Sequence, residues 1–244
     1  MSEATAHPAD ARRTELATSL AAVRHRISAA CASAGRDPGE ITLVVVTKYF
    51  PASDILLLHE LGVRAIGENK DQEAGPKLAE VRRELPRDAD LELHFVGRLQ
   101  SNKARHVAEY ADVVHSVDRI KLLRGLSAGA VERGRPLSVL IQMSLDGDTG
   151  RGGALPDHVP ELAAAVADGA ALVLKGVMAI APVEADPDES FAVLQEVASG
   201  VRALHPGADW VSAGMSGDLE AAIRHGATHL RVGTAILGSR PSLL

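Results

Sequence analysis

The sequence predicts a single α/β domain of the (β/α)8 TIM-barrel class with an extra N-terminal helix. Apolar β-forming segments alternate with amphipathic or Ala-rich helical segments, as a parallel sheet with right-handed crossovers requires. Eight such units fit into 244 residues, a usual length for a closed barrel, whereas a doubly wound open sheet usually has fewer strands. The segment Leu43–Val46 is apolar without alternation, which is typical of a strand buried on both faces.

Each element follows from a local pattern. Residues 1–10 are predicted to be disordered, and residues 11–244 to form the barrel domain. Apolar residues recur every three or four positions between residues 16 and 27, so a helix precedes the first strand, and Gly35 ends it. Strands are predicted near residues 41–47, 64–68, 91–97, 113–117, 137–145, 172–180, 210–215 and 229–237. Helical patterns fill the gaps, among them residues 71–85, 118–132, 156–167 and 189–204.

Composition sets the kind of core and excludes several classes of protein. Hydrophobic residues make up 46% of the chain but aromatic residues only 2%, so Ala, Val, Leu and Ile must build the core. A net charge of -6 without a basic block argues against nucleic acid as a partner. The single cysteine, Cys31, excludes an intrachain disulfide and indicates a reducing compartment. No apolar run reaches membrane-span length and no signal-peptide pattern is seen, so we expect a cytoplasmic protein.

Lys48 directly follows the first predicted strand. In α/β barrels the chemistry sits at the C-terminal ends of the strands. A lysine there is either paired in a salt bridge or functional, because an unpaired ammonium out of water is costly. It can also lose its proton and attack a carbonyl to form a Schiff base. This stretch alone leaves the structural and the functional interpretation open.

Glycines and hydroxyl residues follow the last two predicted strands, in residues 212–218 and 231–234. They could simply make tight turns, with Ser216 and Thr234 as helix caps. Two such turns in neighbouring loops, where barrels of this class bind phosphate, favour an anion site. Arg231 shares a strand face with Gly233, so it lies beside that site. A lysine, a phosphate site and a ring-facing side chain together indicate pyridoxal phosphate.

Six segments carry a more specific signal, and they occur in order over about residues 41–240. They are Val46-Thr47-Lys48, Gly67-Glu68-Asn69 with Gln72-Glu73, His94–Lys103, Gly176-Val177-Met178, Ser212–Asp218 and Arg231–Gly238. In this order they resemble the pyridoxal phosphate homeostasis family (YggS/PROSC type), which is similar to the N-terminal barrel domain of alanine racemases. Three positions depart from the family pattern, Arg98, Ala213 and Ser144, and they affect only the expected rim of the site.

The resemblance implies that Lys48 carries pyridoxal 5'-phosphate as an internal aldimine. It implies cofactor-binding roles for Lys48, Asn69, Ser212, Met215, Ser216, Arg231, Gly233 and Thr234. Among these, Ser212, Ser216, Gly233 and Thr234 would hold the phosphate. Arg231 would face the pyridine nitrogen and keep it unprotonated, which makes the ring a weaker electron sink.

Cofactor binding does not by itself make an enzyme. Racemisation of the alanine racemase type needs a base on each face of the substrate carbon, and racemases take the second base from a C-terminal domain that this chain is expected to lack. Of the two tyrosines, Tyr49 follows Lys48 and Tyr110 ends a helical segment, and neither is a convincing second base. We therefore expect no catalytic residues and no strong turnover, but a carrier acting in vitamin B6 and amino-acid homeostasis.

Two alternatives stay open. One is a pyridoxal-phosphate-dependent amino-acid racemase of low activity, and the other is a Schiff-base aldolase that acts through Lys48 without a bound chromophore. The expected partners are the cofactor and, transiently, pyridoxal-phosphate-dependent apoenzymes, and we expect a monomer. No metal site is expected, because residues 146–153 begin like a calcium loop but lack its glycine and oxygen ligands. Whether this loop acts as a lid is left open.

Overall fold

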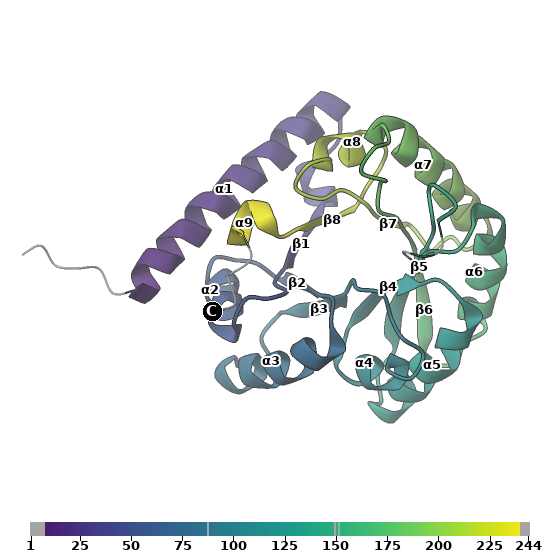
Figure 1. Ribbon diagram of the computed structural model, residues 1–244, viewed down its shortest axis with the longest axis horizontal. Coiled ribbons are helices and arrows are strands. Elements are labelled where there is room, and N and C mark those ends of the chain that lie inside the picture. The colour runs from purple at the N-terminus through teal and green to yellow at the C-terminus, as the bar shows by residue number, and fades with distance from the viewer. Residues whose placement is uncertain (1–7, 87, 149, 151, 240–244) are drawn as a thin grey trace, which may run out of the picture.

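The computed structural model describes residues 8–86, 88–148, 150 and 152–239, and these form a closed parallel barrel. The strands follow one another in sequence order, and β1 pairs with β8 to close the ring (Figure 1). The predicted fold class is confirmed. The strands are β1 (Thr42–Val46), β2 (Ala65–Glu68), β3 (Glu92–Phe95), β4 (Val113–Val117), β5 (Leu137–Gln142), β6 (Leu172–Met178), β7 (Trp210–Ser212) and β8 (His229–Val232).

Helices cover the outside of the barrel and connect successive strands (Figure 1). The α-helices are α1 (Pro8–Ala34), α2 (Ala52–Glu60), α3 (Asp71–Glu84), α4 (Ala104–Tyr110), α5 (Leu123–Glu132), α6 (Val159–Ala167), α7 (Pro187–Leu204), α8 (Leu219–Arg224) and α9 (Thr234–Leu237). Short 3-10 helices are η1 (Pro38–Glu40), η2 (Ile120–Leu122) and η4 (Pro156–His158). In the part of the chain that the structure describes, no helix is long and apolar enough to cross a membrane.

The last predicted strand is shorter than its apolar run suggested. Strand β8 ends at Val232, and residues 234–237 form helix α9 instead of continuing the strand to residue 237. Gly233, with φ -118° and ψ -73°, takes the backbone out of the strand. The cause of the error is general, since a short apolar run has no periodicity that separates a strand from a helix.

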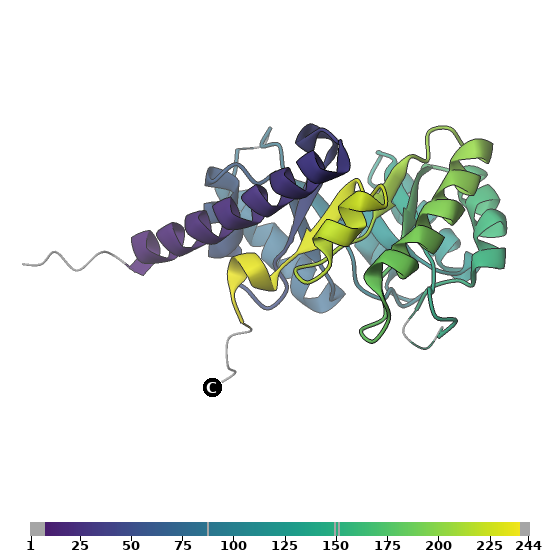
Figure 2. The ribbon, with the colours of Figure 1, turned by 90° about the horizontal axis from the view of Figure 1, so that it is seen from above.

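The long N-terminal helix α1 lies against the seam where the barrel closes. It runs beside α8 and α9 (Figure 2), and its apolar face is buried as predicted, with Leu16 and Leu20 nearly inaccessible. The helix begins at Pro8, so residues 8–10 are helical and not disordered as expected. Proline suits the first turn of a helix, where its missing N–H costs nothing. The rest of the predicted disordered stretch, residues 1–7, lies outside the described residues.

The barrel has two different buried regions. Between the strands and the surrounding helices lies an apolar core, to which β1, β2 and β4 contribute Val45, Ile66 and Val114. We call this the outer core. Inside the ring of strands, side chains from opposite sides of the barrel meet, and His115 on β4 approaches Ser212 on β7 within 2.9 Å. This barrel interior contains polar side chains, and beside them the small apolar cluster of Val113, Leu140 and Met178, which is separate from the outer core.

Candidate functional site

A cavity of about 570 Å³ opens at the C-terminal ends of the strands, and its size suits a small-molecule ligand. Its walls come from the ends of β1 and β8 and from residues that follow β1, β2, β3, β6, β7 and β8. The fold thus brings together residues that are far apart in the sequence. Of the predicted site residues, the cavity is lined by Lys48, Asn69, Met215, Ser216, Arg231, Gly233 and Thr234.

Lys48 is half-buried in this cavity, two residues after the end of β1. Its ammonium makes no hydrogen bond or ion pair with any residue that the structure describes. The Nζ atom lies 5.9 Å from the centroid of the Tyr49 ring. The structural alternative for this lysine, a salt bridge, is therefore not found within the described part of the chain.

A second lysine, Lys77 on α3, holds the backbone around Lys48. Lys77 is buried, and its Nζ lies 2.8 Å from Glu68 Oε1 and 2.7 Å from Glu73 Oε1. The same ammonium donates to the carbonyl of Thr47 at 3.0 Å. Burial raises the pKa of Glu68, and the charge of Lys77 opposes that rise. Sequence reasoning missed this cluster, although Glu73 and Lys77 stand four residues apart on one helix, the spacing of an ion pair.

The residue after Lys48 has an unusual backbone conformation. Tyr49 has φ 70°, in the left-handed region that side chains other than glycine rarely adopt. Its N–H donates to Glu73 Oε1 at 2.5 Å, so the Lys77 cluster fixes the turn on both sides of Lys48. Such strain persists only where surrounding contacts enforce it, and it is concentrated at functional sites.

Two neighbouring loops line the cavity with residues whose backbone N–H groups have no acceptor among the described residues. The N–H groups of Ser216 and Gly217 after β7, and of Gly233 and Thr234 after β8, donate to no residue that the structure describes. Ser216 Oγ accepts a hydrogen bond from Ala235 N at 3.3 Å, which joins the two loops. Converging N–H groups of this kind bind anions, so the arrangement fits the predicted phosphate site.

The first of these loops is held from two sides. Gly214 has φ +87°, and a Cβ there would lie 2.7 Å from Ala222 Cβ and 2.8 Å from Leu230 Cδ2, so the turn requires glycine. On the outer side, Arg26 of α1 donates from Nη1 to the carbonyl of Ser216 at 3.0 Å. The extra N-terminal helix therefore helps to position the loop after β7.

Arg231 on β8 reaches the cavity from the barrel interior and is only 5% exposed. Its Nη1 donates to Ser212 Oγ at 2.5 Å and its Nη2 to the carbonyl of Ala179 at 2.8 Å. Burial lowers the pKa of Arg231 to about 10, against the opposing charge of Asp218. The guanidinium therefore stays charged at neutral pH.

Among the predicted site residues, Ser212 differs from the others in its position. Its side chain is fully buried beneath the cavity and does not line it. Because β7 ends at Ser212, this side chain still belongs to the barrel interior, where it contacts Arg231 and lies 2.9 Å from His115 Nδ1. Its hydroxyl accepts a hydrogen bond from Arg231, and its expected role at the phosphate stays a prediction.

The cavity is electropositive although the chain carries a net charge of -6. Lys48, Arg98 and Arg231 line it, and its described lining includes no carboxylate. Asn69 Oδ1 is buried without a hydrogen-bond partner among the described residues. The Asn69 backbone is fixed by Gly97, where a Cβ would lie 2.0 Å from the Asn69 carbonyl oxygen. A polar, anionic ligand would satisfy these groups.

The two tyrosines lie in different surroundings. Tyr49 lines the cavity, whereas Tyr110 does not. The Tyr110 hydroxyl is buried and donates to Asp71 Oδ1 at 3.1 Å. Burial, together with the charge of Asp71, raises the pKa of Tyr110. This tyrosine is therefore poorly placed and poorly tuned to act as a base.

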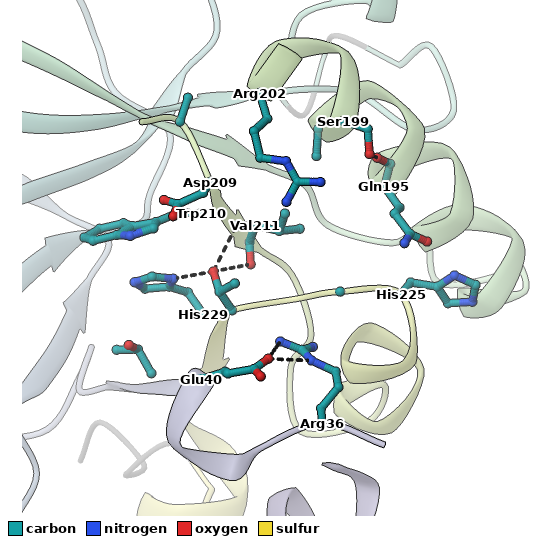
Figure 3. Close-up of a pocket in the computed structure, with 15 residues that line it drawn as sticks. Arg36, Glu40, Gln195, Ser199, Arg202, Asp209, Trp210, Val211, His225 and His229 are labelled. Atoms are coloured by element: carbon teal, nitrogen blue, oxygen red, sulfur yellow. Dashed lines mark hydrogen bonds and ion pairs between the residues drawn. The ribbon is translucent and has the colours of Figure 1, made fainter. Parts of the chain in front are cut away.

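A second cavity, of about 540 Å³, lies at the opposite end, around the N-terminal ends of β7 and β8 (Figure 3). Trp210 and His229 stack there with ring centroids 4.2 Å apart, and Arg36 pairs with Glu40. None of the predicted site residues lines it. Over the described residues, no group of three or more His, Cys, Asp or Glu side chains could hold a metal ion.

Comparisons with known proteins agree with this geometry. The family model "Alanine racemase, N-terminal domain" matches residues 18–241. The chain is 45% identical to the pyridoxal phosphate homeostasis protein of Mycobacterium bovis, over 94% of each chain. It is 42% identical to the protein of the same name from Escherichia coli K12, over 93% of this chain and 97% of the relative. Among solved structures, PipY of Synechococcus elongatus with pyridoxal phosphate bound is 33% identical, with a TM-score of 0.76 over 91% of this chain and all of that one.

Proposed function

The chain belongs to the alanine racemase N-terminal domain family and to the pyridoxal phosphate homeostasis proteins, and we propose that it holds pyridoxal 5'-phosphate at Lys48 and releases it to other proteins. The observation that carries this proposal is the Lys48 ammonium, unpaired among the described residues, in an electropositive cavity lined also by Ser216, Gly217, Gly233 and Thr234, whose N–H groups have no acceptor among those residues. When bound, the cofactor supplies an aldehyde that joins an amine and a ring that withdraws electrons.

The residues present fit this cofactor. Lys48 Nζ would provide the amine for covalent attachment, and the N–H groups of Ser216, Gly217, Gly233 and Thr234 would bind the phosphate. Arg231 is a permanent cation at neutral pH and would donate to the ring nitrogen, which holds that nitrogen unprotonated. Asn69 and Met215 complete the lining.

We propose a carrier without strong catalysis. Racemisation needs a second base opposite Lys48, and Tyr110 lies outside the cavity with its hydroxyl engaged by Asp71. Tyr49 lines the cavity, so the racemase alternative rests on this residue. We further propose that the protein acts as a monomer in the cytoplasm and meets apoenzymes transiently, in amino-acid as well as vitamin B6 homeostasis.

An absorbance spectrum of the purified chain with added pyridoxal phosphate, before and after borohydride reduction, tests the attachment. We expect a visible band that reduction fixes onto the peptide containing Lys48. Lys48→Ala should abolish this covalent labelling and leave the fold intact, because its side chain makes no polar contact with the described residues. Lys70→Ala is a matched control, since Lys70 is an exposed lysine on the same rim that does not line the cavity.

A colourless protein that takes up no cofactor would contradict the proposal and favour the aldolase alternative. Labelling retained in the Lys48→Ala variant would move the attachment to another lysine. A racemase assay on the loaded protein, with a Tyr49→Phe variant beside it, separates the carrier from the low-activity enzyme.

A further inference from the structure

The barrel interior contains a continuous chain of polar side chains that ends at Arg231. Arg231 Nη1 contacts Ser212 Oγ at 2.5 Å, and His115 Nδ1 lies 2.9 Å from the same oxygen. The other nitrogen of His115, Nε2, lies 2.8 Å from His94 Nδ1. His94 Nε2 is 3.4 Å from Glu92 Oε2, close enough for electrostatic contact although not aligned as a hydrogen bond. The chain therefore crosses the barrel from β8 to β3.

Hydrogen-bond chemistry allows one consistent direction along this series of side chains. The Arg231 guanidinium can only donate, so Ser212 Oγ accepts from it and its own hydrogen is available for His115 Nδ1. A neutral imidazole that accepts at Nδ1 donates at Nε2, and His94 Nδ1 receives that hydrogen. The proton of His94 then lies on Nε2, which faces the carboxylate of Glu92. With these tautomers, every donor in the series points from Arg231 toward Glu92.

The charges at the two ends match this direction. Burial, with the neighbouring charges of His94 and Arg231, lowers the pKa of His115 well below its ordinary value, so the middle of the chain is neutral. Contact with His94 lowers the pKa of Glu92. The dipoles of the chain therefore connect a positive end in the cavity to a negative end, Glu92, that is partly exposed at the start of β3.

Arg231 needs such support. It is 5% exposed, and none of the carboxylates in the described residues lies within ion-pair distance of it. Its hydrogen-bond partners are neutral, the hydroxyl of Ser212 and the carbonyl of Ala179. A buried charge without a counter-ion is costly unless hydrogen bonds and oriented dipoles replace the lost water.

We infer that Ser212, His115 and His94 are positioning residues, which hold the buried Arg231 guanidinium as a fixed donor toward the ring nitrogen of the bound cofactor. The inference rests on the proposed function. These three residues do not line the cavity. They act on the contact between Arg231 and the ring nitrogen, and not on the other contacts of the cofactor.

The test compares two ligands on two variants of the full chain. Ser212→Ala removes the contact to Arg231, and Ser116→Ala is the matched control, because Ser116 is a buried serine beside His115 whose hydroxyl has no partner among the described residues. Dissociation constants are measured for pyridoxal phosphate and for its 1-deaza analogue, in which a C–H group replaces the ring nitrogen.

For Ser212→Ala we expect a dissociation constant for pyridoxal phosphate about tenfold above wild type, as for the loss of a hydrogen bond to a charged group. The deaza analogue should change by less than about twofold, because it lacks the atom that Arg231 contacts. Ser116→Ala should leave both constants within about twofold of wild type. Equal weakening of both ligands by Ser212→Ala would show a merely structural role, and no weakening would also overturn the inference.

The experiment also distinguishes failure of the proposed function from misfolding of the Ser212→Ala variant. If wild type binds neither ligand, the proposed function fails and not the positioning chain alone. If Ser212→Ala does not fold, as judged by circular dichroism, Glu92→Gln decides, because Glu92 is 52% exposed and tolerates substitution. Removal of this negative charge should raise the dissociation constant of pyridoxal phosphate about twofold to threefold and leave that of the deaza analogue unchanged. An unchanged ratio of the two dissociation constants would overturn the inference.

Discussion

The outer core and the barrel interior are both buried, yet they are built from different side chains. The outer core contains apolar residues such as Ile66, Leu126 and Phe191, each almost inaccessible. The interior contains His94 and His115, which are equally inaccessible and bonded to each other. The difference teaches that burial serves two purposes in this fold. Apolar contacts outside the strands stabilise the barrel, and polar contacts inside them organise the ligand cavity.

The largest expected effect is a loss of stability on substitution in the outer core, without a change in ligand affinity. Phe191→Ala on α7 removes a ring from the outer core and should lower the free energy of unfolding by about 3–5 kcal/mol. The folded fraction should bind pyridoxal phosphate with unchanged affinity, because Phe191 does not line the cavity. Urea unfolding and ligand titration measure the two quantities. Val193→Ala, at a position 44% exposed on the same helix, serves as the control and should change the stability little.

The comparison therefore predicts a loss of stability in Phe191→Ala without a loss of affinity for pyridoxal phosphate. If Phe191→Ala weakened binding as strongly as it weakened folding, the two buried regions would be one unit and the distinction between them would fail.

The next effect is a pH dependence of the folding stability, which arises from histidines of the barrel interior. The pKa of His229 is lowered from 6.5 to about 3, chiefly by burial and also by the charge of His94, while the charge of Glu92 opposes the shift. The pKa of His115 is also lowered by burial. Between the folded and unfolded pKa values the unfolded chain binds more protons, so stability is full above about pH 6.5 and falls as the pH drops below it. Each histidine should contribute a slope of up to about 1.4 kcal/mol per pH unit.

Urea unfolding between about pH 7 and pH 5 measures this slope. His229→Gln should make the profile shallower, because the substituted side chain does not titrate. His25→Gln provides a control, since His25 lies on the exposed side of α1. A profile that stays equally steep in His229→Gln would assign the acid sensitivity to other groups.

The smallest effect concerns the contacts of Arg26 with the loop between β7 and α8, residues 213–218. Arg26 pairs with Glu220 at 2.8 Å while both side chains are more than a third exposed, so Arg26→Gln should cost at most about 1 kcal/mol of stability. The same change removes the contact to the Ser216 carbonyl, and we expect about threefold weaker binding of pyridoxal phosphate, of the order of one weak hydrogen bond. Arg13 lies on the same helix as Arg26, and Arg13→Gln breaks only its exposed pair with Glu60 of α2, so it should leave the affinity unchanged.

Much of the fold was predictable, because strands and helices leave local patterns in the sequence. The eight strands occur where apolar β-forming runs were found, and α1 buries the face that its spacing indicated. The errors lie at boundaries. Residues 8–10 are helical, and the apolar run after Gly233 is helix α9, since neither segment is long enough to have a periodicity of its own.

Most residues of the predicted site follow a strand, and Arg231 lies at the end of one. Lys48 and the two loops after β7 and β8 could be placed by the rule that chemistry gathers at strand ends. Ser212 faces the barrel interior and does not line the cavity, which depends on where the three-residue strand β7 ends. The partnership of His115 with Ser212 spans 97 positions in the sequence and arises only when the barrel closes. The local signal for this contact was the presence of His115, with Ser116, among the valines of β4.

The stacking of Trp210 on His229 has a practical consequence. The chain contains one tryptophan, and its ring lies 4.2 Å from an interior imidazole and 5.1 Å from the ammonium of Lys175. A charge that appears or disappears beside an indole alters its emission. The protein thus contains its own optical probe, located at the mouth opposite the cofactor cavity, and its fluorescence will report events in the barrel interior without any added label.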